Sequence, residues 1–360
     1  MDISVLDKNF ICQNVIDTYI SFIWTDRYNT YGDFELYIPM SNDILDIIKR
    51  DYYLKINTSE HVMIVENIKL TTDAENGPSL LVTGRSLESI LLRRIIWTQT
   101  IFSKNTKIWV VISNLLRDNV YSPSISKRKI NTFYTYMVTE GDVTNIALTG
   151  DLQFTGDNLY DAINKICNLY DLGFKITLEN NLFVFTLYKG SDRSYAQDTL
   201  PYVEFSPNFD NLINSEYSID VTNYKNVTLV AGEGEGVNRT TEIVDDGDYS
   251  DLSRYELYTD ARDLSSEVDG GTLTPTQYKE VLRNRGLSKL AETIVESNFD
   301  AQVDYLSMYV YGEDYNMGDI VQFVNEYGIG AKVRITEFIQ SDSTENGMEQ
   351  YPKFEILEEV

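Results

Sequence analysis

The chain has 360 residues, a length that predicts two or three domains, and a hydrophobic fraction of 42%, which excludes wholesale disorder. Its 30 basic and 56 acidic side chains give a formal net charge of −26, so naked DNA or an anionic membrane is not expected to bind the surface as a whole. Two cysteines cannot form a disulfide framework, and the single histidine, His61, removes most histidine-based catalysis.

Residues 1–85 have the pattern of a β-rich domain. Residues 21–24 and 34–38 are apolar segments, and alternate residues of the second segment fall on one face. A short amphipathic helix is predicted over residues 42–50.

A β-hairpin is predicted to close this first region. Four apolar residues are predicted to share the buried face of its first strand: Val62, Ile64, Ile68 and Leu70. Asn76-Gly77-Pro78 supplies the turn into the second strand, residues 80–82.

Residues 86–200 are predicted to form a separate α+β domain. The predicted helices span residues 86–94, 107–119 and 157–170, and the predicted strands span residues 174–178 and 182–188. The third helix has the clearest pattern, because its apolar residues follow the three-and-four spacing of one buried face. Gly173 is predicted to cap this helix, since glycine adopts the left-handed conformation without strain.

Residues 201–360 return to β-structure around one long helix. The predicted strands span residues 217–221, 226–230, 239–244, 303–311, 320–325, 331–340 and 353–357. Thr274, Pro275 and Gln277 are typical of a helix start, with threonine as the N-cap, proline at the first position and glutamine completing a capping box. This helix is predicted to run to about residue 296, and residues 237–300 to form an insertion or arm.

The run Gly232-Glu-Gly-Glu-Gly236 has only a superficial similarity to a phosphate-binding loop. A dinucleotide-binding loop has the spacing G-x-G-x-x-G and leads into a helix. Here the spacing is G-x-G-x-G, a strand is predicted next, and two glutamates repel phosphate. The run therefore predicts a bent hairpin or a close approach of another backbone.

No pattern in the sequence indicates catalysis, a metal site or a cofactor. Cys167 lies on the predicted buried face of its helix, where thiols are usually inert, and one histidine with two distant cysteines gives no zinc spacing. The acidic loop over residues 245–251 does not fit the EF-hand pattern and favours a solvated loop over a calcium site. A carboxylate pair for glycoside hydrolysis stays open, because 56 acidic residues always offer some pair.

The charge is unevenly distributed. Residues 1–200 carry 19 basic and 24 acidic groups, a net of −5, whereas residues 201–360 carry 11 and 32, a net of −21. A basic run lies in the middle region around Trp109: Lys104, Lys107, Arg117, Lys127, Arg128 and Lys129. Nucleic-acid binding is one interpretation, but docking on an acidic partner, or on the acidic third part of a neighbouring copy, is simpler.

Several motifs, in this order along the chain, resemble the Gp37-like family of siphovirus tail proteins. In the first half they are residues 23–28, 31–36 and 84–91, with Arg93 and Arg94. In the second half they are residues 226–236 with Arg239, and residues 256–264. Residues 315–321 and 334–337 resemble the closing barrel of tail hub proteins more widely.

The resemblance implies a mainly β structure in which two tail-tube-like β-barrels, residues 1–85 and 201–360, flank the α+β domain. It implies a trimeric tail hub of the virion, without enzymatic activity, cofactor or metal, and without membrane insertion. Its expected partners are the hexameric tail tube or a distal tail ring, and a tail-tip, spike or receptor-binding protein. The protein is expected to assemble in the host cytoplasm, at the tail tip or baseplate, and to let DNA pass without specific binding.

Ten residues are predicted to contribute to assembly interfaces: Tyr31, Gly32, Asp33, Arg85, Arg93, Arg94, Gly232, Gly234, Gly236 and Asp319. The alternative is that the glycines and Asp319 shape turns and the arginines pair locally. Two other functions stay open: a tail-associated cell-wall hydrolase that uses a carboxylate pair, and a module that binds host-surface carbohydrate.

Overall fold

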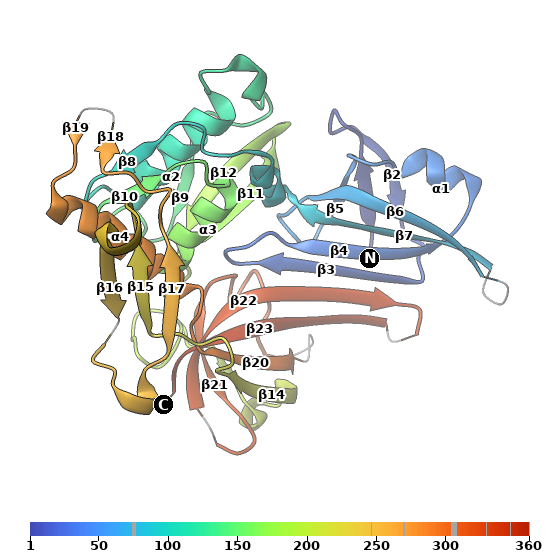
Figure 1. Ribbon diagram of the computed structural model, residues 1–360. Coiled ribbons are helices and arrows are strands. Elements are labelled where there is room, and N and C mark those ends of the chain that lie inside the picture. Colours follow the sequence, from blue (N-terminus) through green and yellow to red (C-terminus); the bar gives the residue numbers. More distant parts are fainter. Residues whose placement is uncertain are drawn as a thin grey trace.

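The computed structural model describes residues 1–73, 77–245, 247–268, 271–303, 308–328, 330–345 and 347–359. One large, almost entirely antiparallel sheet spans the molecule, with a helical region and a small second sheet on one side (Figure 1). The prediction of a mainly β protein is confirmed. Among the described helices, none is both long enough and apolar enough to span a bilayer.

The first region forms one half of the large sheet. Its elements are β1 (Ile3–Leu6), β2 (Cys12–Ile16), β3 (Ser21–Arg27), β4 (Asp33–Pro39), α1 (Asn42–Ile47), β5 (Tyr53–Ile56), β6 (Met63–Asp73) and β7 (Gly77–Ser86). The predicted strands and the short helix are confirmed, and Phe34, Leu36 and Ile38 are buried on one face of β4. Residues 74–76, which include part of the predicted turn, lie outside the described residues.

The prediction of one shared face on β6 is wrong, because a β-bulge falls between Val65 and Asn67. Val62 and Ile64 pack into the core of the middle region, whereas Ile68, beyond the bulge, packs against the core of the first region. A bulge inserts one residue and so exchanges the two faces of a strand. Leu70 lies farther out along the hairpin and is 53% exposed.

The middle region packs three helical segments against short strands. Its elements are β8 (Thr100–Phe102), α2 (Ile108–Leu116), β9 (Val138–Glu140), β10 (Leu152–Phe154), α3 (Leu159–Leu169), β11 (Gly173–Glu179) and β12 (Leu182–Tyr188), with a 3₁₀ helix at Leu87–Arg93. The predicted helices and strands are confirmed in type. Gly173 does not cap α3: Asp171 takes the left-handed conformation there, with φ of 54°, and Gly173 begins β11.

The third region completes the large sheet and adds a small separate unit. The sheet strands are β13 (Glu204–Phe205), β14 (Leu212–Asp220), β20 (Glu296–Val303), β21 (Ile320–Val324), β22 (Gly330–Ser343) and β23 (Gly347–Glu359). The predicted strand over residues 303–311 is wrong: β20 ends at Val303, residues 304–307 lie outside the described ones, and Tyr309 and Tyr311 pack against the core.

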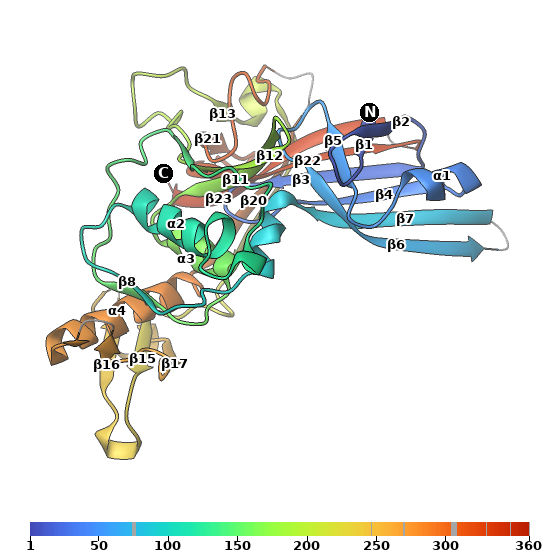
Figure 2. The ribbon, with the colours of Figure 1, turned by 90° about the horizontal axis from the view of Figure 1, so that it is seen from above.

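The small unit has its own core. It consists of β15 (Val227–Ala231), β16 (Thr241–Asp245), β17 (Glu256–Asp260) and α4 (Pro275–Ala291), with a two-stranded ribbon, β18 (Glu267–Val268) and β19 (Gly271–Thr272). The predicted cap is confirmed, since Thr274 and Gln277 exchange hydrogen bonds in a capping box. In the small sheet β15 lies between β16 and β17, and a long loop, the β16–β17 loop, connects these two outer strands. Figure 2 shows this loop projecting from the unit, away from the rest of the chain.

Pairing between β3 and β22 joins the two ends of the chain in one sheet. The register runs from Ser21 opposite Ser343 to Arg27 opposite Glu337, and the path of the sheet is β14-β20-β23-β22-β3-β4-β7-β6-β5-β1-β2. The described pairings leave this path open at both ends. The two closed barrels and the domain boundaries at residues 85 and 200 stay predictions.

Candidate functional site

The ten predicted interface residues lie in four separate places. Tyr31, Gly32, Asp33 and Arg85 lie where β3, β4 and β7 meet the middle region. Asp319 precedes β21, and the three glycines lie in the loop between β15 and β16. Arg93 and Arg94 end the 3₁₀ helix and line a pocket on the middle region.

Tyr31 and Arg85 connect the large sheet to α3. The Tyr31 amide donates to Tyr160 Oη at 3.2 Å, and the two rings lie 5.2 Å apart. Arg85 donates to both carboxylate oxygens of Glu66, at 2.7 and 2.9 Å, and its guanidinium lies 5.1 Å from the centre of the Tyr31 ring. Both residues therefore have partners within the chain, and their contribution to an assembly interface stays a prediction.

Asp33 helps to hold the two halves of the large sheet together, and Gly32 lies at a close contact next to it. Arg27 donates to Asp33 Oδ2 at 2.6 Å and to Glu337 Oε1 at 2.7 Å, and so links β3, β4 and β22. A Cβ at Gly32 would collide with the carbonyl oxygen of Thr25. The glycine is needed because backbone approaches backbone here.

Asp319 is buried and organises the connection between the middle region and β21. Its Oδ1 accepts from the Ser191 amide at 2.6 Å. Its Oδ2 accepts from Arg193 Nε at 2.8 Å and from the Asn316 amide at 3.0 Å. The carboxylate has three partners within the chain, so its contribution to any interface is indirect.

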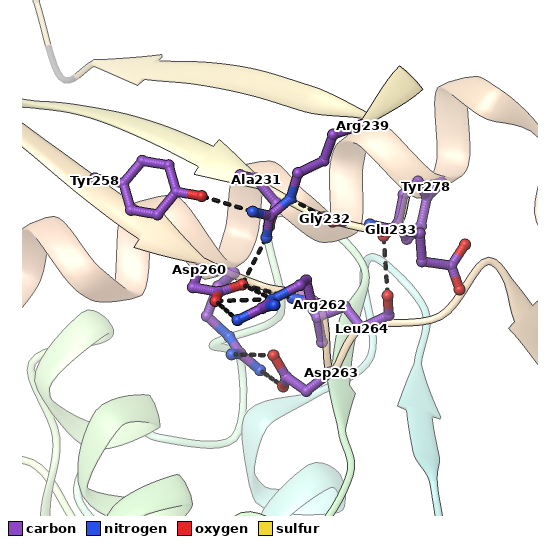
Figure 3. Close-up of polar contacts among 11 residues, drawn as sticks. Ala231, Gly232, Glu233, Arg239, Tyr258, Asp260, Arg262, Asp263, Leu264 and Tyr278 are labelled. Atoms are coloured by element: carbon purple, nitrogen blue, oxygen red, sulfur yellow. Dashed lines mark hydrogen bonds and ion pairs between the residues drawn. The ribbon is translucent and has the colours of Figure 1, made fainter. Parts of the chain in front are cut away.

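The glycine loop is built around Arg239 (Figure 3). The guanidinium donates to the carbonyl oxygens of Gly232 and Ala231 at 2.9 and 2.7 Å, to Tyr258 Oη at 2.7 Å and to Asp260 Oδ1 at 2.6 Å. The side chain is only 17% exposed. Arg239 thus fastens the loop to β17, and its planar fork suits several acceptors at once.

Glu233 also holds the glycine loop in place through its amide and its carboxylate. The Glu233 amide donates to Tyr278 Oη at 2.8 Å, and the Glu233 carboxylate accepts from the Ser266 amide and hydroxyl at 3.0 and 2.6 Å. A Cβ at Gly232 would collide with the Tyr278 hydroxyl, and Gly234 has φ of 100°. β15 and β16 pair antiparallel on either side of the loop, so the loop closes a hairpin, as predicted.

Ion pairs surround this loop on the side of β17. Arg262 forks onto Asp260, and Arg285 on α4 pairs with Asp263 at 3.0 Å. The hydrogen bonds from Arg262, and then from Arg239, hold the pKa of Asp260 well below its usual range. Every arginine drawn in Figure 3 has a carboxylate partner.

Arg93 and Arg94 line a pocket of about 350 Å³ in which, unlike around the glycine loop, the described arginines have no carboxylate partner. Arg94 donates to the carbonyl oxygens of Arg128 and Arg93 at 3.0 and 2.9 Å, and Arg128 donates to the Ile95 carbonyl at 2.6 Å. The Arg128 guanidinium lies 4.9 Å from the centre of the Trp97 ring. Burial, and then the charges of Arg128 and Arg93, lower the pKa of Arg94.

A buried charge cluster around His61 was not predicted from the sequence. His61 Nδ1 lies 3.1 Å from Glu88 Oε1, and Asp26 accepts from Ser59 Oγ at 2.7 Å. Glu88 also accepts from the Ile176 amide at 2.6 Å, which joins β11 to the 3₁₀ helix. Burial alone would lower the pKa of His61, but the charges of Asp26 and Glu88 raise it to about 9.

Tyr28 is a second residue that sequence reasoning missed. Its carbonyl oxygen accepts from Tyr188 Oη at 3.2 Å, and the Arg334 guanidinium lies 5.5 Å from the centre of its ring. Gly173 and Gly318 both lie against that ring, where a Cβ would collide with it. Tyr28 therefore packs at the meeting point of all three regions, and the glycines far away in sequence were the only available signal.

The described residues contain no cluster of three or more His, Cys, Asp or Glu that could hold a metal ion, and Asp246 of the acidic loop lies outside them. Cys167 is buried on α3, and burial raises the pKa of its thiol well above the usual range. A thiol in this state is a packing group and not a nucleophile.

Comparison with known proteins gives a family and a fold. A model of the Siphovirus ReqiPepy6 Gp37-like protein family matches residues 2–352. The structure of a tail protein from Neisseria meningitidis MC58 is similar with a TM-score of 0.58 at 14% identity, covering 98% of this chain and 96% of that one. No curated protein matches the sequence.

Two prophage proteins have a similar structure. The 43 kDa tail protein of prophage MuSo2 from Shewanella oneidensis gives a TM-score of 0.58 at 12% identity, with 98% of each chain covered. Prophage tail protein gp18 from Listeria monocytogenes EGD-e gives 0.55 at 11% identity, covering 99% of this chain and 94% of that one. At such low identity the likeness shows a shared fold.

Proposed function

The chain belongs to the Siphovirus ReqiPepy6 Gp37-like protein family, a family of bacteriophage tail proteins, and we propose that it is the trimeric hub of the tail. In this role three copies form a ring between the hexameric tail tube, or a distal tail ring, and the tail tip, spike or receptor-binding protein. The observation that carries the proposal is the family match, which extends over residues 2–352.

The shared fold supports the same role. Tail proteins from three different bacteria have a similar architecture over at least 98% of this chain. The large sheet runs through the first and third regions without interruption, and such a continuous element suits a ring subunit that bears load along the tail. The protein acts in the virion at the tail tip or baseplate, after assembly in the host cytoplasm.

The charge distribution supports a DNA channel through the ring. Residues 201–360 carry a net charge of −21, and like charges keep DNA from adhering to a wall that it must pass. The acidic third region lines this channel, and DNA passes without a specific site. The role we propose is structural, and we assign no catalytic role to the chain.

Antibody labelling of intact particles tests this proposal. A gold-labelled antibody against the chain is expected to mark the tail tip, and class averages of the purified protein are expected to show a three-fold ring. Label distributed along the tube or on the head would overturn the hub role. Release of sugars or peptides from cell walls by the purified chain would instead indicate a hydrolase.

A further inference from the structure

The pocket beside Arg93 holds positive charge that no ion pair among the described residues neutralises. Among the described residues, Arg93, Arg94 and Arg128 form no ion pair, and neither do Lys127 and Lys129, which lie on the same segment as Arg128. Ten arginines elsewhere in the described chain do form ion pairs. In a protein with a net charge of −26, a group of unpaired cations is a site for an acidic ligand.

The pocket is preorganised. Backbone carbonyl oxygens fix Arg94 and Arg128, and Arg128 also donates to Asn119 Oδ1 at 3.1 Å. These contacts hold the guanidinium groups together despite their mutual repulsion. A site whose charges are already in place loses less entropy when a partner binds.

The pocket also has an apolar side. Trp97 is 58% exposed and Ile95 is 44% exposed, and Leu92 lines the same pocket. A bare inorganic anion uses none of this surface. The combination of a basic rim and an apolar wall fits a peptide segment that presents carboxylates together with an apolar side chain.

The tip of the β16–β17 loop carries acidic groups and an apolar side chain, which complement the pocket. Asp245, Asp248 and Asp251 are exposed there, and Leu252 is 88% exposed. Part of the tip forms a short 3₁₀ turn, in which Ser250 and Ser253 form a capping box. The loop projects from the small unit, so its tip is accessible to another chain (Figure 2).

One copy cannot fill its own pocket with this loop. In Figure 1 the segment over residues 117–130, drawn in teal, protrudes at the top of the view, whereas the tip of the β16–β17 loop lies at the bottom. A patch and its complement at different places on one chain form a head-to-tail contact, and such contacts give a ring when the rotation between copies closes.

We propose that the pocket around Arg93, Trp97 and Arg128 binds the tip of the β16–β17 loop of a neighbouring copy. The proposal rests on the ring of three copies proposed above and names the contact that closes it. The acidic third region of one subunit then neutralises the basic segment of the next.

A charge-exchange experiment tests the contact. The pocket variant is Arg93→Glu with Lys127→Glu, two exposed side chains without ion pairs in the described chain, and the loop variant is Asp245→Lys with Asp248→Lys. Sedimentation equilibrium of the full chain is expected to show at least tenfold weaker association for each variant, and recovery when pocket and loop variants are mixed. The matched control, Lys49→Glu with Lys55→Glu, changes two exposed lysines elsewhere and is expected to associate normally.

The possible outcomes separate this contact from the function on which it rests. If wild-type chain and both variants associate equally, the contact is overturned and the ring stands on other surfaces. If the wild-type chain stays monomeric at every concentration, the hub itself is overturned. Normal association of the pocket variant, with loss of binding to a labelled single-stranded oligonucleotide, would assign the pocket to nucleic acid and also overturn the contact.

Discussion

Two groups of arginines on this chain have opposite surroundings. Around the glycine loop, Arg239, Arg262 and Arg285 each have a carboxylate partner, and Arg239 also holds two backbone carbonyl groups. In the pocket of the middle region, Arg93 and Arg94 contact no carboxylate in the described structure and are fixed by backbone alone or not at all. The first group holds a fold together, and the second is available to a partner.

This difference predicts how each group responds to substitution. Removal of an arginine that is paired within the chain leaves its acceptors without that donor, so the free energy of unfolding is expected to fall. Removal of an arginine without a carboxylate partner leaves no acceptor unpaired, so the change is expected in the association of the copies and not in the stability of one chain. The four predictions below test this division, from the largest expected change in stability to the smallest.

Arg239→Met is expected to lower the stability of the small unit by about 3 kcal/mol, because four hydrogen bonds are lost and Asp260 loses a charged partner. The Ala231 carbonyl keeps the Ala261 amide as a donor. Hydrogen exchange of the β15, β16 and β17 amides measures this change locally. Arg283→Met, an exposed arginine of α4 with no ion pair in the described chain, is the control and is expected to change stability by less than about 0.5 kcal/mol. Equal effects of the two substitutions would contradict the distinction between arginines paired within the chain and arginines without a carboxylate partner.

The buried charges around His61 are also paired within the chain, and they predict that the stability depends on pH. The pKa of His61 is raised from 6.5 to about 9 by Asp26 and Glu88, against burial and the charge of Lys175. The contribution of protonated His61 to the free energy of unfolding is complete below pH 6.5. It is lost as the pH rises through about 9, a change on the order of 2 to 3 kcal/mol.

Urea unfolding between pH 6 and pH 10 measures this loss. His61→Gln is expected to be less stable at pH 6 and to have a flatter pH profile over the same range. An unchanged profile in this variant would show that other groups cause the pH dependence.

Gly232→Ala is expected to destabilise the small unit by about 2 kcal/mol, since the added Cβ meets the Tyr278 hydroxyl and Leu282 in a packed site. Gly236 in the same loop has nothing within 4 Å of an added Cβ, but its φ is 54°. Gly236→Ala therefore carries only the cost of the left-handed backbone, about 1 kcal/mol. Thermal unfolding of both variants gives the order, and the reverse order contradicts the packing described for Gly232.

Arg93→Ala is expected to change the free energy of unfolding by less than about 0.5 kcal/mol, because the side chain is exposed and has no ion pair in the described part of the chain. Arg85→Ala is the comparison, since Arg85 pairs with Glu66 and lies over Tyr31. Urea midpoints measure both. A loss of stability for Arg93→Ala as large as that for Arg239→Met would show that Arg93 stabilises the fold, as Arg239 does.

The sequence predicted the elements whose determinants are local. The capping box of Thr274 and Gln277, the apolar face of α3 and the alternation of β4 all depend on residues within a few positions of each other. The same holds for the glycine loop, whose glutamates and spacing favour a bent hairpin over a phosphate site, and whose conformation is fixed by contacts with Ser266 and Tyr278.

The sequence could not show what depends on distant pairs. The β3–β22 pairing joins residues more than 300 positions apart, and Tyr28 acquires its role from Gly173 and Gly318. The bulge after Val65 reversed the faces of β6 without any glycine or proline to mark it. Charge composition indicated a basic middle region, but only the fold shows which arginines have a carboxylate partner.

The central claim, a hub of three copies, is tested most directly by the mass of the purified protein in solution. Sedimentation velocity at micromolar concentration is expected to give a species of three times the 41.4 kDa mass of one chain. Added salt is expected to weaken it, because the proposed contact is between opposite charges. A single species of 41.4 kDa at every concentration and salt level would contradict the claim.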